Sequence, residues 1–313
     1  MENKFKDVKR IENIEEFVGS LEFDQLPMVE EEISLYHYTS IYGLEGIIKN
    51  KELWLSKSEF LNDKLELKYT LDTIMTLIEQ FSGDNNNTEE LVFKEWIKQS
   101  IQNKFFSLEI YTLSLSTNKD SNLLWSNYAN NDGYNVEFIY PELLHILNTN
   151  ITENHEPKKL FIFPYAVVYN KEKQLELLKK ELINLYKIFL YAFDTNDEKL
   201  YYKYGSKTLA NIVTYSIFFK DSSFNQEEEF RIAAYFTDVE YAKKVTKFRI
   251  SNGIFIPYIP LSIENINNNK LIQSINIGPK NSLDIAKVGM EYFLNSCNME
   301  EVEVKKSKIP YRY

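Results

Sequence analysis

The sequence predicts an α+β protein in which helices surround a curved β-sheet. Short segments rich in β-branched and aromatic residues recur at strand spacing along the chain. Amphipathic helical patterns separate these segments. A block rich in Lys, Glu and Leu, residues 171–218, stands between strand-rich regions. We expect it to be a helical insertion in a single domain that spans residues 34–313.

The amino-terminal part of the chain is expected to be rich in helix. Residues 1–33 are predicted to form a helical lead-in, because their apolar residues recur at helical spacing. A short apolar strand, an amphipathic helix and a second strand at 53–55 follow. Two further helices are predicted over residues 63–81 and 88–104, with a polar loop at 85–87 between them.

Strands dominate the remainder of the chain outside the helical block. They are predicted over residues 108–116, 134–139, 161–169, 230–236, 245–250, 255–259, 274–277 and 302–305. Pro164 lies within one of them and indicates an edge position or a bulge, because proline cannot donate a hydrogen bond to a neighbouring strand. Gly278 and Pro279 close another strand. A final helix, capped by Ser282, is predicted over 283–295.

Composition and charge exclude several classes of protein. The 313 residues carry a net charge of −10, which argues against a protein that coats nucleic acid, because phosphate neutralisation requires clustered Lys and Arg. The single cysteine, Cys297, excludes an internal disulfide and a cysteine-based zinc site, and we interpret it as a buried thiol. Gly-rich phosphate loops and the HExxH and GxSxG motifs do not occur. No metal site is expected.

The sequence shows no targeting or membrane-spanning segment. The first thirty residues are acidic and lack an apolar run followed by a cleavage site. No stretch approaches the roughly eighteen continuous apolar residues that a membrane-spanning helix needs. We therefore expect a cytoplasmic protein with no membrane partner.

Three segments carry side chains suited to chemistry. The first is His37-Tyr38-Thr39, where a strand ends before a helix. A histidine at this position can give one ring nitrogen to a ligand hydroxyl while backbone fixes the other. The alternative is a half-buried histidine whose hydrogen bonds are satisfied within the protein.

The second segment runs from Leu124 to Gly133 and contains Trp125 and Tyr128. Residues three apart share one face of a helical turn. This pair would stack on the flat ring of a ligand or fill the core. Tyr128 is the better candidate for ligand contact, because core packing is the commoner fate of a tryptophan.

The third segment, residues 219–231, is an acidic run that leads into a strand. In an extended chain Glu227 and Glu229 would point to the same side. Two carboxylates presented together can stabilise an oxocarbenium-like centre, and repulsion between them would raise one pKa. The alternatives are a solvated acidic loop, or a structural salt bridge in which Arg231 neutralises one carboxylate.

The order of these segments resembles a bacterial family catalogued as domain of unknown function 2971. The residues that carry the resemblance are LYHYTS at 35–40, LND at 61–63 with Glu66, WSNYA at 125–129 with Gly133, FKDSSFNQEEEFR at 219–231, IGP at 277–279 and SKIPYR at 307–312. They span nearly the whole chain after the lead-in. Phe230 stands where the family usually has tryptophan, and the helical block at 171–218 is larger than the family pattern suggests.

That family is similar to the ADP-ribosyltransferase fold. The resemblance implies a split, curved mixed sheet that holds NAD between residues from separate strands. A His or Arg orients the nicotinamide ribose, a Tyr or Ser supports the ring, and a Glu steadies the ribose as nicotinamide departs. The matching positions are His37, Tyr128 and Glu229, with Glu227 completing an E-x-E pattern. Further candidates for NAD contact are Tyr38, Thr39, Trp125 and Arg231.

The resemblance implies an NAD-dependent ADP-ribosyltransferase or NAD-cleaving effector in bacterial anti-phage defence or acting as a toxin. NAD would be the substrate, no metal would be needed, and a macromolecule or water would accept ADP-ribose. The E-x-E pattern is typical of arginine-directed transferases, whereas a first-position histidine is typical of other branches, so the acceptor stays open. Two alternatives remain: a non-catalytic nucleotide-binding sensor or interaction module, and an enzyme that modifies nucleic acid. A basic groove beside His37 would favour the last.

Overall fold

The structure is a computed structural model that describes residues 8–22, 26–27, 33–60, 64–81, 88–106, 109–154, 159–251, 253–264, 271–281 and 283–310. The chain divides into two compact units. The first contains residues 1–27, 63–108 and 168–222, and the second contains residues 28–62, 109–167 and 223–313. The predicted helical block at 171–218 is therefore grouped with residues 63–108.

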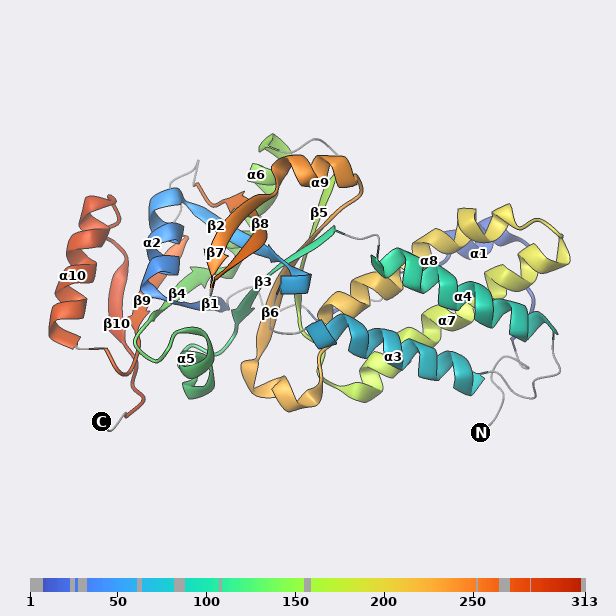
Figure 1. Ribbon diagram of the computed structural model, residues 1–313, viewed down its shortest axis with the longest axis horizontal. Helices are drawn as coiled ribbons and strands as arrows, with labels where there is room; N and C mark the ends of the chain where they lie inside the picture. The colour runs from blue at the N-terminus through green and yellow to red at the C-terminus, as the bar shows by residue number, and fades with distance from the viewer. Residues whose placement is uncertain are drawn as a thin grey trace. The chain divides into compact units, whose positions relative to one another are not determined.

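The first unit is built from helices, which are labelled in Figure 1: α1 (Ile14–Gly19), α3 (Lys64–Phe81), α4 (Thr88–Phe106), α7 (Lys171–Asp194) and α8 (Lys199–Phe218). Aromatic side chains join α4, α7 and α8. The rings of Phe93 and Tyr186 meet edge to face with centroids 4.9 Å apart, and those of Trp96 and Tyr201 lie 5.1 Å apart. Such contacts explain why helices far apart in the sequence form one unit.

The predicted helical lead-in over residues 1–33 is described only in part. Only α1, six residues long, is helical in that part, and the side chain of Asn13 caps it by accepting from the backbone of Glu15 and Glu16. Residues 1–7, 23–25 and 28–32 lie outside the described residues. The loop predicted at 85–87, residues 61–63 and Ser282 lie outside them too.

The second unit contains a curved, open mixed sheet of ten described strands (Figure 1). The strands are β1 (Ser34–Thr39), β2 (Glu52–Lys57), β3 (Glu109–Ser116), β4 (Tyr134–Ile139), β5 (Leu160–Ala166), β6 (Glu229–Phe236), β7 (Lys247–Ser251), β8 (Ile254–Ser262), β9 (Ile272–Ile277) and β10 (Glu303–Lys306). Their order is β10-β9-β4-β1-β3-β2-β8-β7, and β6 pairs with both β3 and β5. Only the β9–β10 pair is parallel among these strands.

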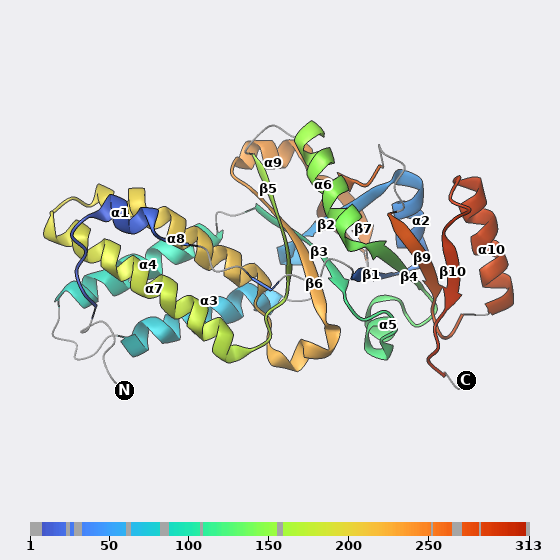
Figure 2. The same ribbon diagram turned by 180° about the vertical axis from the view of Figure 1, so that it is seen from behind.

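Helices of the second unit cover one face of this sheet. They are α2 (Ile41–Asn50), α6 (Tyr140–Asn154) and α10 (Leu283–Ser296), whose apolar side chains share one hydrophobic core with the strands. Figure 2 shows α6 lying across the strands. The shorter elements are α5 (Asn122–Tyr128), α9 (Val239–Val245) and the 3-10 turns η1 (Ser58–Phe60) and η2 (Ser222–Glu227). Neither α6 nor α9 is predicted from the sequence.

Strand alternation gives the sheet a second, polar face. Leu113 and Leu115 of β3 belong to the hydrophobic core, so Ser114 and Ser116 between and after them point the other way. Glu229 and Arg231 of β6 also point to this polar face, because they alternate with core residues. Glu229 lies opposite Ser116, and Arg231 lies opposite Ser114. The short helix α5 packs on this face through a small cluster that includes Tyr36 and Trp125.

Pro164 lies where the sequence predicts, and Cys297 is less buried than predicted. Pro164 lies in β5, which pairs with β6 alone among the described strands, so the predicted edge position is confirmed. Cys297 follows α10 and is partly buried against the hydrophobic core. No helix in the described ranges is long and apolar enough to cross a membrane.

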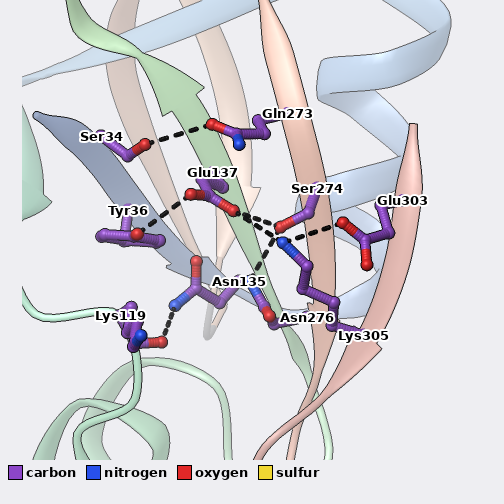
Figure 3. A network of polar contacts seen from close by, with 10 residues as sticks. All are labelled: Ser34, Tyr36, Lys119, Asn135, Glu137, Gln273, Ser274, Asn276, Glu303 and Lys305. Carbon is purple, nitrogen blue, oxygen red and sulfur yellow. Dashed lines mark hydrogen bonds and ion pairs between the residues drawn. The ribbon is translucent and has the colours of Figure 1, made fainter. Parts of the chain in front are cut away.

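A buried polar network joins β1, β4, β9 and β10 on the polar face (Figure 3). Glu137 of β4 is at its centre. Its carboxylate accepts hydrogen bonds from the hydroxyls of Tyr36, at 3.1 Å, and Ser274, and the amine of Lys305 lies 3.6 Å away. Burial acts to raise the pKa of Glu137, but the hydrogen bonds and Lys305 outweigh it, so the pKa lies below its ordinary value.

Glu137→Gln is expected to lower the free energy of unfolding by about 1–3 kcal/mol at neutral pH, because it removes a carboxylate that receives charge-assisted hydrogen bonds. A depressed folded-state pKa gives stability that is complete above the ordinary value of 4.5 and is lost as the pH falls through the folded-state value. Urea denaturation of wild type and variant at about pH 7 and pH 3 measures both effects. A difference that stays constant between these pH values would contradict the assignment.

Candidate functional site

His37 lies where β1 separates from β3. Among the described residues only Tyr36 and Ser116 are paired in register between these strands. The His37 ring is half-buried, and its Nδ1 lies 3.2 Å from the carbonyl oxygen of Ser114. Burial lowers the pKa of His37 and the charge of Arg249 lowers it further, while the contact with Ser114 partly opposes them. His37 is therefore a neutral imidazole at physiological pH.

The tautomer of His37 follows from this contact. A carbonyl oxygen only accepts hydrogen bonds, so Nδ1 must carry the hydrogen. The Nε2 atom of the neutral ring then holds a lone pair and can accept a hydrogen bond from a ligand hydroxyl. This is the arrangement that the sequence predicts for a ligand-orienting histidine.

Ser114 connects the His37 strand to Glu229. The hydroxyl of Ser114 donates to Glu229 Oε1 at 2.6 Å. Arg231 binds the same carboxylate through two hydrogen bonds, from Nε to Oε1 at 2.8 Å and from Nη2 to Oε2 at 2.9 Å. Glu229 and Arg231 are each only 5% exposed. The carboxylate is thus held in one position by neighbours on β3 and β6.

Glu227 and Glu229 do not form the parallel carboxylate pair that an extended chain predicts. Glu227 ends the 3-10 turn η2, and Glu228 has a left-handed backbone with φ of 44°. The side chain of Glu227 therefore meets a different group, the hydroxyl of Tyr128, which donates to it at 3.0 Å. The predicted salt bridge between Arg231 and Glu229 is present.

Tyr128 is 41% exposed, so its ring can meet a ligand. Trp125 is fully buried, and its indole nitrogen donates to Asp120 at 2.7 Å. Its ring meets Tyr38 edge to face, with centroids 4.9 Å apart. The Tyr38 hydroxyl donates to the carbonyl of Asn118 and accepts from the backbone of Ser121. Trp125 therefore packs within the protein, as the alternative interpretation expected. Tyr38, predicted to contact NAD, is buried against it.

Thr39 and Gly133 approach each other closely through the backbone. A Cβ atom added at Gly133 would lie 2.4 Å from the carbonyl oxygen of Thr39 and 2.8 Å from that of Ala129. The Oγ1 atom of Thr39 occupies the space where a Cβ of Gly43 would stand, at 2.0 Å. Thr39 thus packs against two glycines at the end of β1, two residues after His37.

Gly133→Ala is expected to destabilise the second unit by about 1–3 kcal/mol, because the added methyl group would overlap two backbone carbonyl oxygens. Thermal unfolding followed by circular dichroism measures the change. Gly289→Ala in α10 is the matched control: its Cβ would meet nothing within 4 Å, and alanine favours a helix over glycine. Equal melting temperatures for Gly133→Ala and wild type would show that the close approach is absent.

Two residues of the site were missed in the sequence. Ser114 offered a weak signal, the alternation of serine with leucine in Leu113 to Ser116, which marks a polar strand face. Arg249 offered none, because an arginine in KFRIS is equally typical of a solvated edge strand. Arg249 lies on β7, and its Nη2 donates to the Ser56 hydroxyl at 3.1 Å.

No group of three His, Cys, Asp or Glu side chains in the described ranges is placed to hold a metal ion.

Comparison with known proteins adds one match. Residues 124–232 match the family model described as Protein of unknown function (DUF2971). The matched segment is shorter than half of the chain, and it contains Trp125, Tyr128, Glu227, Glu229 and Arg231. The match supports the DUF2971 resemblance noted in the sequence. No curated protein and no solved structure matched the chain significantly.

Proposed function

We propose that this protein is an NAD-dependent ADP-ribosyltransferase, or an NAD-cleaving effector if water is the acceptor. The observation that carries the proposal is the continuous set of contacts that links His37 on β1 to Glu229 on β6 through Ser114 on β3. A histidine, a serine and a glutamate on three separate strands are the residue types that this chemistry uses. The resemblance of the sequence to the family, and through it to the ADP-ribosyltransferase fold, gives independent support.

The proposed reaction breaks the bond between nicotinamide and ribose, and the bonding electron pair leaves with nicotinamide. Positive charge develops on the ribose, and a fixed carboxylate close to it stabilises the transition state. Glu229 is held by Ser114 and Arg231, so it would act through its charge. His37 would accept a hydrogen bond from a ribose hydroxyl at Nε2, and Tyr128, fixed by Glu227, would contact the nicotinamide ring.

Nicotinamide release from NAD by the purified full-length protein tests the proposal. Release without further additions would indicate an NAD glycohydrolase. Release that needs bacterial lysate would indicate a macromolecular acceptor, which labelled NAD would then mark. A protein that binds NAD but releases no nicotinamide, with or without lysate, would contradict catalysis. The setting in anti-phage defence or as a toxin is part of the same proposal and rests on the resemblance alone.

One observation favours a second candidate function, a non-catalytic nucleotide-binding module. The carboxylate of Glu229 is engaged by Arg231 on both oxygens and is almost fully buried. Such a pair suits a structural role at least as well as catalysis. The two functions differ in one measurement: a binding module would hold NAD unchanged over hours at saturating protein concentration.

A further inference from the structure

Arg249 differs from the other described arginines in its partners. Arg10 pairs with Glu89, at 2.8 Å, and with Asp194. Arg231 pairs with Glu229. Arg249 has no carboxylate partner within the described ranges, and its recorded hydrogen bond goes to the uncharged Ser56 hydroxyl.

The Arg249 side chain is also partly removed from water. Its residue is half-buried, and burial lowers the pKa of its guanidinium, only partly opposed by Tyr258. Burying a charge without a partner of opposite sign destabilises a protein. The chain tolerates this cost at one position, on the same sheet as His37. Uncompensated charges of this kind are typical of sites that receive a charged ligand.

Strand register places Arg249 on the polar face that carries Ser114, Glu229 and Arg231. Arg249 on β7 lies opposite Ile256 on β8, and Tyr258 shares the face of Ile256 because it is two residues further along. Tyr258 lies opposite Ser56 on β2, which in turn lies opposite Thr112 on β3. Thr112 and Ser114 share one face because they are two residues apart.

A second observation marks the same area of the sheet. Thr112 is 3% exposed, and its Oγ1 atom has no hydrogen-bond partner among the described residues. Its cross-strand neighbour Ser56 receives the hydrogen bond from Arg249. The site therefore holds an uncompensated cation beside a polar group whose hydrogen bonding is incomplete.

We propose that Arg249, supported by Ser56, binds the diphosphate of the dinucleotide substrate on the polar face that carries Ser114 and Glu229. The identity of the substrate rests on the proposed function, while the assignment of a phosphate site rests on Arg249 itself. A guanidinium offers paired N–H donors that match phosphate oxygens. The sequence has no Gly-rich phosphate loop that would supply this contact from the backbone.

The local charge suits a single diphosphate better than a nucleic-acid backbone. The neighbouring amines are already paired: Lys247 with Glu52 at 3.6 Å, and Lys57 with Glu109 at 3.0 Å. One uncompensated cation does not make the basic groove that a polynucleotide needs. Arg249 is therefore assigned to a small phosphorylated ligand.

Binding of ADP and of inorganic pyrophosphate, measured by isothermal titration calorimetry, tests the assignment. Arg249→Gln should weaken ADP binding about tenfold to a hundredfold, because it removes charge-assisted hydrogen bonds. Arg249→Lys should lose less, because it keeps the charge and loses the paired donors. Lys243→Gln, an exposed amine on α9, is the control and should bind as wild type does. Without ligand, Arg249→Gln should melt at or above the wild-type temperature, because it removes an uncompensated half-buried charge.

The outcomes separate this inference from the proposed function. Wild-type binding of ADP that depends on Arg249, without any NAD cleavage, would support the phosphate site and overturn the enzyme. Cleavage of NAD with the same KM in Arg249→Gln and wild type would support the enzyme and overturn the phosphate site. Failure of the wild type to bind either ADP or pyrophosphate would also overturn the phosphate site.

Discussion

Glu229→Gln is expected to reduce nicotinamide release from NAD by roughly 10²–10³-fold while NAD still binds. The substitution removes the negative charge that would face the developing positive charge on the ribose, and one preorganised electrostatic contact of this kind contributes on that scale. Steady-state release measured by chromatography gives kcat and KM separately. The loss should fall on kcat, because the interaction is made in the transition state.

Two further variants make this result specific. Glu228→Gln changes the exposed neighbouring carboxylate, which accepts a hydrogen bond from Asn118 at 2.9 Å, and should leave release within about twofold of wild type. Ser114→Ala keeps the Glu229–Arg231 pair but removes the serine hydroxyl, so it should lower kcat by about tenfold without unfolding the protein. Release by Glu229→Gln at the wild-type rate would remove Glu229 from the mechanism.

Arg231→Met should lower the free energy of unfolding by about 3–5 kcal/mol. The substitution leaves the carboxylate of Glu229 buried without its cationic partner, and Glu229 is only 5% exposed. Breaking a buried ion pair by removing one partner costs more than the pair itself contributes, because the remaining charge keeps its desolvation penalty. Urea denaturation of the two proteins at neutral pH measures the difference.

The double variant Arg231→Met with Glu229→Gln is the matched control. It removes both charges, so it should recover much of the stability that Arg231→Met loses. If the double variant is less stable than the single one by the full cost of a second independent substitution, the two side chains do not form the pair that the structure shows.

The sequence predicted most strands and helices because each carries its own periodic pattern. It also placed His37 at the end of a strand and Glu229 at the start of another. The pairing of strands far apart, β1 with β3 and β3 with β6, has no local signal, so the contact of Ser114 with both His37 and Glu229 was not predictable.

Other differences have local causes. Glu227 and Glu229 were treated as one extended segment, but the 3-10 turn and the left-handed φ of Glu228 interrupt the extended chain there. The apolar stripes of residues 63–81 and 171–218 indicate that each helix packs against another element, but they do not indicate which element. The grouping of these helices in one unit was therefore not predicted. Arg249 was not recognised from the sequence, because only the structure shows that it has no carboxylate partner in the described ranges.

A crystal structure of the E229Q variant with NAD would test the central claim most directly, because the slowed variant would keep the substrate intact. We expect NAD where β1 separates from β3, with its nicotinamide ribose against His37 and position 229 and its diphosphate against Arg249. NAD bound away from these residues, or no NAD at saturating concentration, would contradict the account.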